Sequence, residues 1–332
     1  MRNTGKATLK PTSLKPPRSG ATALCPGCLA LGMAVVAISA TAVFGSEDVP
    51  HRPFAQLADV PEPGQFIGGL VYEESEAYHI FVHGASQDIT YHSADGEKYG
   101  IDINQGFLAL QYGITERWAA DVNIGGTTVG WRYFDNGKVQ SATGLMDFDF
   151  GVRYQAFNEA KSDSPWVPTL TLRAGAVLPG SYNENFPFAP GLRSAAIEPE
   201  ILARKHFGWP GLGAYTDLLY RWNRTTANDQ YIAVIGLFQQ IKGWELDAGY
   251  RHLQTISGSD ISFTSGVPTS LVYPRDPREI SESIEAGFSY TTSKRHIRYG
   301  FQSLTIFAGN NADRAFWVGG SIDVPFGGRH HE

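Results

Sequence analysis

The stretch LMDFDFGVRYQ, residues 145–155, alternates apolar and polar side chains along its whole length. Every second residue from Met146 to Tyr154 is large and apolar, whereas the residues between them, from Asp147 to Gln155, are polar or glycine. Successive side chains of a β-strand point to opposite faces, so this period of two predicts a strand with one apolar and one polar face.

The same alternation recurs along the chain. In residues 244–251, for example, Trp244 and Leu246 oppose Glu245 and Asp247. We expect twelve such strands, at residues 65–73, 101–112, 117–131, 145–156, 167–178, 194–205, 213–223, 230–240, 244–254, 281–291, 296–307 and 314–326. Each is close to the ~9–11 residues that a tilted strand needs to cross a bilayer. The first and the eighth show the weakest alternation, because both of their faces are fairly apolar.

The connections between these strands alternate in length. Short turns are expected at residues 113–116, 241–243 and 292–295, and long loops at residues 74–100, 134–144, 179–193 and 255–280. Short turns at one end and long loops at the other are typical of an outer-membrane β-barrel. Three connections depart from this rule: residues 157–166 are long for the short-turn side, whereas 225–229 and 308–313 are short for the long-loop side.

Aromatic residues gather at the ends of the expected strands. Beside the short turns lie Tyr112, Trp118, Tyr154, Trp166, Phe207, Trp209, Trp244 and Tyr290, and toward the long loops lie Trp131, Tyr133, Trp222, Tyr231 and Phe316. Two such belts are expected where a barrel meets the two membrane interfaces. A soluble β-sandwich shows the same alternation but needs no belts. We therefore predict an all-β fold, a single twelve-stranded antiparallel transmembrane β-barrel in the bacterial outer membrane, in contact with outer-membrane lipid.

The N-terminal region is typical of a secretory signal peptide. Residues 1–45 contain five basic residues and no acidic one, and an apolar run extends from Leu29 to Phe44. This arrangement predicts cleavage near residue 42 or 45. Both cysteines, Cys25 and Cys28, precede the apolar run and would be removed with it.

The remaining chain divides into three parts. Residues 46–64 contain four prolines and little apolar pattern, which predicts a periplasmic lead-in. Residues 65–326 form the predicted barrel, and residues 327–332 form a C-terminal tail. The last strand ends in Phe326, which resembles the insertion signal of bacterial outer-membrane proteins and implies recognition by the barrel-assembly machinery. The tail is a departure, because that signal usually lies at the very C-terminus.

Composition excludes several classes of protein. The net charge is −6, so the chain shows no basic surface for nucleic acid. With 42% hydrophobic residues, it is too apolar for a disordered protein. No phosphate-binding glycine loop, paired-cysteine metal site or dinucleotide fingerprint follows an expected strand, so no cofactor is predicted.

Two hairpin segments carry a resemblance to a known family. The first comprises residues 111–118 (QYGITERW), followed by Asp121 to Ile124, and the second comprises residues 144–154 (GLMDFDFGVRY). Both are similar to the outer-membrane "meta-pathway of phenol degradation" family, although Met146 replaces a glycine that is usual there. The resemblance extends over residues 65–326. It implies an outer-membrane barrel that moves hydrophobic or aromatic compounds, and it brings no catalytic residues.

The predicted inward face is rich in charge, because charged side chains at mid-depth on the lipid face would cost roughly 2–4 kcal/mol each for Arg or Lys. The lumen-lining candidates are Asp147, Asp149, Arg153, Arg173, Glu198, Glu200, Asp217, Arg221, Glu245, Asp247, Arg251, Glu285 and Arg298. The charges either select solutes in a polar conduit or pair with one another and fill a narrow barrel. Within this set, Asp149 and Arg173 are expected to form a cross-strand ion pair.

Other chemistry finds weaker support in the sequence. His79, His83 and His92 lie in the first long loop near carboxylates, but their spacing fits no compact metal motif. The tail sequence RHHE, residues 329–332, is expected to be solvated. Ser93, between His92 and Asp95, is the nearest candidate for a hydrolase, but adjacent strand residues point to opposite faces.

The predicted function is therefore passive passage of a small aromatic or hydrophobic molecule of unknown identity across the outer membrane, without enzymatic activity. One alternative is a closed structural or adhesion-type barrel whose external loops bind ligands. A third possibility is an outer-membrane lipid hydrolase.

Overall fold

The computed structural model describes residues 57–132, 139–182, 191–208, 210–224, 227–263, 271–272, 277–314 and 316–328. The predicted signal peptide, the lead-in as far as residue 56 and the tail from residue 329 lie outside these residues. No helix in the described ranges is long and apolar enough to cross a membrane.

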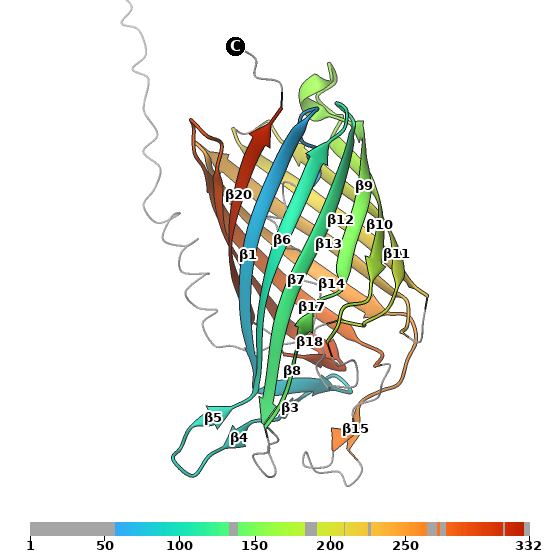
Figure 1. Ribbon diagram of the computed structural model, residues 1–332, viewed down its shortest axis with the longest axis vertical. Coiled ribbons are helices and arrows are strands. Elements are labelled where there is room, and N and C mark those ends of the chain that lie inside the picture. The colour runs from blue at the N-terminus through green and yellow to red at the C-terminus, as the bar shows by residue number, and fades with distance from the viewer. Residues whose placement is uncertain are drawn as a thin grey trace, which may run out of the picture. The chain divides into compact units, whose positions relative to one another are not determined.

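Within the described chain, twelve antiparallel strands form a closed barrel (Figure 1). They are β1 (Gln65–Ala77), β6 (Ile101–Gly113), β7 (Trp118–Arg132), β8 (Val139–Leu145) continued by β9 (Phe148–Phe157), β10 (Thr169–Leu178), β11 (Ala196–His206), β12 (Leu212–Asn223), β13 (Gln230–Ile241), β14 (Trp244–Thr255), β17 (Ile280–Thr291), β18 (Arg298–Asn310) and β20 (Phe316–Gly327). Each pairs with its neighbours in sequence, and β1 pairs with β20 in the register Gly69 opposite Asp323, which closes the ring. The predicted twelve-stranded barrel is confirmed.

The outward face of every strand is apolar at mid-strand, as a lipid-facing surface requires. At mid-strand the exposed side chains are Leu70, Leu108, Ile124, Phe150, Leu172, Ile201, Leu218, Ile235, Leu246, Ile284, Phe301 and Ile322. At the short-turn end, aromatic rings of neighbouring strands lie together. The Trp118 and Tyr154 rings are 4.8 Å apart between centroids, and those of Trp244 and Tyr290 are 4.9 Å apart.

The belt predicted at the long-loop end requires correction at Trp131. This side chain is only 2% exposed and packs inside the barrel end. It stands opposite Ile101 in the β6–β7 ladder, so both side chains point away from lipid. Tyr133 and Trp209 lie outside the described residues.

One strand is interrupted at Met146 and Asp147. β8 and β9 both pair with β7 but are separated by these two residues. Asp147 accepts hydrogen bonds from the Gly180 N–H at 2.7 Å and the Tyr182 hydroxyl at 2.9 Å. Met146 is 4% exposed and packs against the inward-facing Phe107, so the prediction that it faces lipid is wrong. Because the strand is interrupted here, the side chains of the successive residues Met146 and Asp147 can both point inward.

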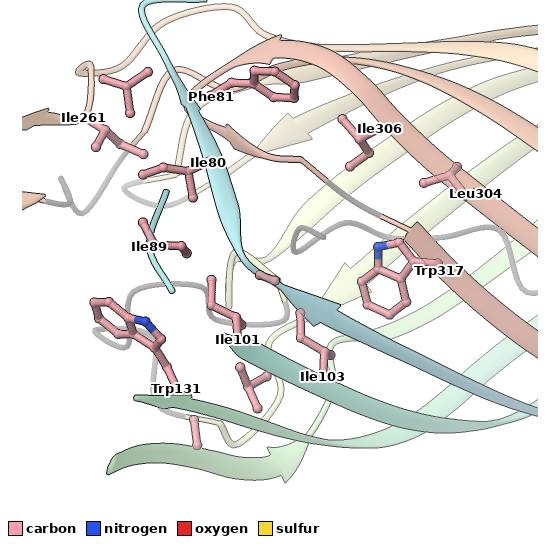
Figure 2. Close-up of a cluster of buried hydrophobic side chains, with 14 residues drawn as sticks. Ile80, Phe81, Ile89, Ile101, Ile103, Trp131, Ile261, Leu304, Ile306 and Trp317 are labelled. Atoms are coloured by element: carbon pink, nitrogen blue, oxygen red, sulfur yellow. The ribbon is translucent and has the colours of Figure 1, made fainter. Parts of the chain in front are cut away.

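A hydrophobic cluster fills the long-loop end of the barrel (Figure 2). Beyond the ends of the barrel strands, β2 (His79–Val82) pairs with β3 (Ala85–Asp88) and with β19 (Ala312–Asp313). The buried side chains of the cluster are Ala77, Ile80, Phe81, Val82, Ile89, Ile101, Ile103, Val129, Trp131, Ala142, Ile261, Leu304, Ile306 and Trp317. Short hairpin strands also form in the loops: β4 (Tyr91–His92) with β5 (Lys98–Tyr99), and β15 (Ser262–Phe263) with β16 (Leu271–Val272).

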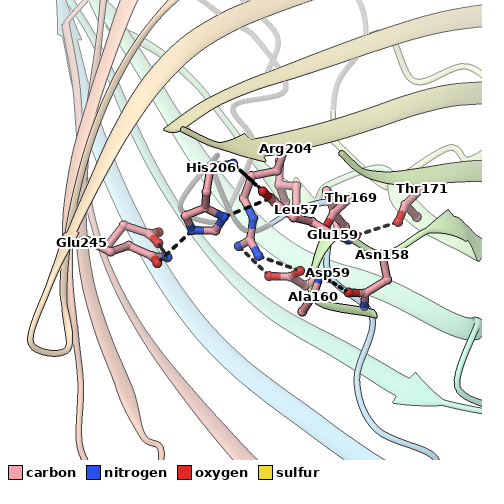
Figure 3. Close-up of polar contacts among 12 residues, drawn as sticks. Leu57, Asp59, Asn158, Glu159, Ala160, Thr169, Thr171, Arg204, His206 and Glu245 are labelled. Atoms are coloured by element: carbon pink, nitrogen blue, oxygen red, sulfur yellow. Dashed lines mark hydrogen bonds and ion pairs between the residues drawn. The ribbon is translucent and has the colours of Figure 1, made fainter. Parts of the chain in front are cut away.

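The described part of the lead-in, residues 57–64, lies against the inner wall at the short-turn end (Figure 3). The Leu57 carbonyl accepts a hydrogen bond from Arg153 Nη1 at 2.8 Å. The Ala58 carbonyl accepts one from the Thr171 hydroxyl at 2.6 Å. Proline-rich sequence gives no periodic pattern, so these tertiary contacts could not be expected from it.

The long connection at 157–166 also belongs to this end. It contains a short 3₁₀ helix, η2 (Glu159–Lys161), which Asn158 caps by accepting a hydrogen bond from Ala160 N–H. The Glu159 carboxylate pairs with Lys205 and accepts the His206 N–H at 3.0 Å. Although burial acts to raise the pKa of Glu159, these hydrogen bonds hold it below the usual value. The connection at 157–166 is long because it folds into a small cap, which the contacts of Glu159 hold in place.

Candidate solute site inside the barrel

The predicted charged residues lie among side chains that the barrel shields from solvent. Ten of them are buried: Arg153, Arg173, Glu198, Glu200, Asp217, Glu245, Asp247, Arg251, Glu285 and Arg298. Asp147, Asp149 and Arg221 are partly exposed. Apart from Asp147, each lies next to an exposed apolar or aromatic side chain; Leu246, between Glu245 and Asp247, is 52% exposed. The strand period thus points the charges toward the barrel axis.

Arg173 on β10 is the centre of an ion-pair network. Its Nη2 lies 2.8 Å from Asp121 Oδ2 and 2.6 Å from Asp149 Oδ1. Its Nη1 lies 3.4 Å from Glu200 Oε2 and 3.6 Å from Glu198 Oε2. The expected Asp149–Arg173 pair is therefore present, within a larger network that draws on four strands.

Asp121 is a member of this network that the sequence reasoning left out of the candidates. Its second oxygen, Oδ1, lies 2.7 Å from Arg153 Nε, so it bridges two arginines. A signal was available, since Asp121 alternates with the apolar Ala120 and Val122. The bridge is needed because Arg173 stands directly opposite Arg153 in the β9–β10 register. The β9–β10 register is shifted by one residue between Leu170 and Thr171.

Two facing glycines make room for the Arg173 guanidinium. Gly151 on β9 is opposite Gly175 on β10. A Cβ atom at Gly151 would lie 2.6 Å from Arg173 Nε, and one at Gly175 would lie 2.6 Å from Nη1. Any larger residue would displace the guanidinium from the wall, so the glycines allow it to lie flat between its carboxylate partners.

A cavity of about 130 Å³ lies beside this network. One part of its wall is charged and includes Asp121, Asp149, Arg153, Arg173, Asp217 and Arg221. The other part is apolar and consists of Leu57, Phe107, Met146, Val177, Leu219 and Ile232. The site thus offers a small molecule both an apolar surface and polar partners, as ligand pockets commonly do.

A second group of buried polar and charged residues lies on β12, β14, β17 and β18. The Tyr215 hydroxyl donates to Glu285 Oε1 at 2.8 Å, and Arg298 Nη2 lies 2.7 Å from Glu245 Oε1. Asp247 is 6% exposed, and neither of its carboxylate oxygens has a hydrogen-bond partner among the described residues. Of the remaining predicted residues, Arg221 pairs with Glu198 at 2.5 Å.

Glu73 on β1 is a further inward charge that was missed. It is buried and accepts hydrogen bonds from Gln105 at 3.1 Å and from Gln302. The alternation around it was obscured because residues 65–73 are apolar on both faces.

The lead-in adds one more charge to the short-turn end. Asp59 Oδ2 lies 2.7 Å from Arg204 Nη1. Burial raises the pKa of the Asp59 carboxyl above its ordinary value, although Arg204 acts to lower it. The ion pair therefore opposes the effect of partial burial on this carboxyl.

The candidates for enzyme and metal chemistry lie in the loops. The Ser93 hydroxyl bonds Asp95, and no hydrogen bond joins it to His92 in the described chain. His92 stands opposite Lys98 in the β4–β5 hairpin. Among the described residues, no three histidine, cysteine or acidic side chains lie close enough together to hold a metal ion.

A comparison with protein families identifies the chain. Residues 84–308 match the family described as "Putative MetA-pathway of phenol degradation". The chain belongs to this family. The resemblance noted in the two hairpin segments is thus confirmed, and the match extends across the inward charges of the Arg173 network.

Solved structures show the same fold. An outer membrane channel from Pseudomonas putida F1 is similar over 84% of this chain and 100% of its own, with 16% sequence identity and a TM-score of 0.62. This likeness shows that the fold is that of a bacterial outer-membrane channel. More remote are the translocator domain of the autotransporter NalP from Neisseria meningitidis (12% identity over 82% and 91% of the two chains, TM-score 0.41) and the CymD monoaromatic hydrocarbon channel (9% over 87% and 97%, TM-score 0.40). A search of curated proteins found no match.

Proposed function

We propose that this member of the phenol-degradation family is a passive outer-membrane channel for a small aromatic or hydrophobic molecule. The cavity carries the proposal, because its wall combines apolar side chains such as Phe107 and Met146 with the charges around Arg173. An aromatic ring fits the apolar part, and a hydroxyl group can bond the polar part. The thirteen predicted lumen residues form the polar wall of the path.

An apolar solute meets different parts of the protein at the two ends of the barrel. At the long-loop end, the solute meets the hydrophobic cluster around Ile80 and Trp317. At the short-turn end, it meets the lead-in held by Arg153 and Arg204. Passage requires both coverings to move, while the barrel wall itself stays intact.

Swelling of liposomes that contain the purified protein tests this function. Benzyl alcohol should enter faster than it enters protein-free liposomes, and a trisaccharide should not. Because the ion-pair network sets the shape of the cavity, Arg173→Met should change the rate for benzyl alcohol, whereas Trp166→Phe, at an exposed turn, should leave it unchanged. Equal rates with and without protein, together with silent bilayer recordings, would contradict a channel.

The covering of both ends favours one other candidate, a closed structural barrel whose loops bind ligands outside the cell. Planar bilayer recordings separate the two functions. A closed barrel gives no current under any condition, whereas a channel gives discrete openings.

We also propose the route to the membrane. Residues 1–45 act as a signal peptide, cut near residue 42 or 45, and the strand ending at Phe326 is recognised by the barrel-assembly machinery. N-terminal sequencing of protein extracted from outer membranes locates the cut. A mature chain that still begins at Met1 would contradict the first part of this proposal.

A further inference from the structure

The inward faces of the barrel strands carry far more negative than positive charge. In the described chain the buried or half-buried carboxylates there are Glu73, Asp121, Asp147, Asp149, Glu198, Glu200, Asp217, Glu245, Asp247, Glu285 and Asp323. The arginines that face them are Arg153, Arg173, Arg221, Arg251 and Arg298. Arg204 is already paired with Asp59 of the lead-in. Carboxylates thus outnumber the facing arginines about two to one.

Part of this excess lies on β14 and β17, where Glu245, Asp247 and Glu285 share the inward face with one arginine, Arg251. Asp247 is opposite Gly287, and Glu285 is opposite Gly249, so carboxylates and glycines alternate across the two strands. A Cβ atom at Gly287 would lie 2.7 Å from Asp247 Oδ2, and one at Gly249 would lie 2.9 Å from Glu285 Oε1. The glycines let both carboxylates lie against the wall. Asp247 and Glu285 together are called the acidic strip below.

The acidic strip retains unused hydrogen-bonding capacity. Both oxygens of Asp247 and the Oε2 of Glu285 are buried without a hydrogen-bond partner in the described chain. The nearby Arg298 is engaged by Glu245 and Ser289. Buried carboxylate oxygens require a positive partner or a hydrogen-bond donor. A cation that passes along the lumen can supply it.

We infer that the lumen selects cations over anions and that Asp247 and Glu285 set this selectivity. The inference rests on the proposed channel function and names the charge class of what passes. A single-sign excess in a confined, low-dielectric lumen concentrates ions of the opposite sign and repels those of the same sign. In the described part of the chain, no three acidic or histidine side chains converge on one point to hold a metal ion. The acidic strip acts on cations in transit, small ammonium compounds included.

The main test is the reversal potential of the full-length protein in planar bilayers under a KCl gradient. At low salt we expect K⁺ to permeate roughly tenfold better than Cl⁻. Asp247→Asn and Glu285→Gln should each lower this ratio, and the double variant should lower it at least about threefold. Raising the salt from ~0.1 M to ~1 M shortens the Debye length from ~10 Å to ~3 Å, and this should also lower the K⁺/Cl⁻ permeability ratio.

A matched control neutralises a carboxylate elsewhere. Glu116 lies in a short turn, and its side chain is 73% exposed, so Glu116→Gln should leave the ratio unchanged. All variants retain the size of the native side chain. Folding is checked by the shift in electrophoretic mobility between unheated and heated samples.

Liposome swelling extends the test to organic solutes of one size. At neutral pH, benzylamine is a cation, benzyl alcohol is neutral and benzoate is an anion. The expected order of entry is benzylamine, then benzyl alcohol, then benzoate, and the double variant should narrow the gap between the first and the last.

The possible failures are distinct. If no solute and no current passes, the proposed function fails, and this inference fails with it. If current flows but Cl⁻ permeates as well as K⁺, or the double variant keeps the wild-type ratio, the channel stands and the role of the acidic strip is refuted.

Discussion

Arg173 shows how one side chain can organise a charged interior. It contacts carboxylates from β7, β9 and β11 across a gap that Gly151 and Gly175 keep clear. A buried ion pair is costly to assemble, but removing one partner is costlier because it leaves the other charged in a poorly solvated place. The network thus fixes the positions of several strands relative to one another.

This argument predicts a non-additive mutant cycle. Arg173→Ala should lower the free energy of unfolding by about 3–5 kcal/mol, because Asp121 and Asp149 lose a shared partner. Asp149→Ala combined with Arg173→Ala should cost less than the sum of the single changes, with a coupling of about 0.5–3 kcal/mol. Urea unfolding from lipid vesicles, followed by tryptophan fluorescence, measures all three variants. Additive losses would show that the two charges are solvated independently.

At the scale of the element, a single strand separates lipid from lumen. Leu246 is exposed on β14, and its neighbours Glu245 and Asp247 are buried on the other face. Leu246→Arg should therefore cost roughly 2–4 kcal/mol of stability in the bilayer. Leu246→Phe is the control, because it keeps the site apolar. Heat-modifiability in gels and urea titration report the difference, and equal stability of both variants would contradict the assigned orientation.

The last strand makes a second prediction at this scale. The Phe326 ring stacks on Phe66 of β1, with centroids 5.4 Å apart, so it joins the first and last strands at the membrane interface. Phe326→Ala should slow assembly. It should also weaken the contact between the two strands, because the aromatic pair contributes about 0.5–1.5 kcal/mol in addition to the burial of apolar area. Removing residues 329–332 should leave assembly unchanged. Pulse-chase measurement of protease-resistant barrel checks both variants; a larger defect from the truncation would move the signal to the tail.

The strands were predictable because alternation depends on the chemistry of one short segment. The predicted bounds of β14, residues 244–254, differ from Trp244–Thr255 by a single residue. Two contacts involve partners remote in sequence. Trp131 packs into the apolar cluster that contains Ile89 and Ile101, and the alternation of β7 places it on the same inward face as Asp121. Leu57 lies in the barrel because Arg153 binds its carbonyl. Only the Leu57 contact leaves no periodic signal in the local sequence.

For the whole molecule, we expect the lead-in to make access to the lumen depend on pH. Burial raises the pKa of Asp59, while Arg204 and Arg298 act to lower it and Glu245 acts to raise it. A lead-in released into water would have an Asp59 near its ordinary pKa of about 3.9. The bound form therefore holds its proton more tightly, and acid favours the bound form.

Channel activity should accordingly fall as the pH drops from neutral toward the ordinary range of aspartate, since the covered state becomes more stable. Asp59→Asn mimics the protonated residue, so it should lower the open probability at neutral pH and remove this pH dependence. Bilayer recordings across the pH range measure both effects, with Glu62→Gln as the control at an exposed lead-in position. Activity that rises in acid would refute this assignment.

The pairing of β1 with β20 also constrains how the barrel is made. These two strands are almost the whole length of the barrel sequence apart, yet they lie side by side (Figure 1). The ring cannot close until synthesis of the chain is nearly complete, so folding must follow translation. Until then, β1 has one unpaired edge, which is open to aggregation. The lead-in immediately precedes β1, so residues such as Ala58, which bonds Thr171 on β10, are tethered beside this seam when it closes. Closure of the seam therefore brings the lead-in to the end of the barrel that it covers.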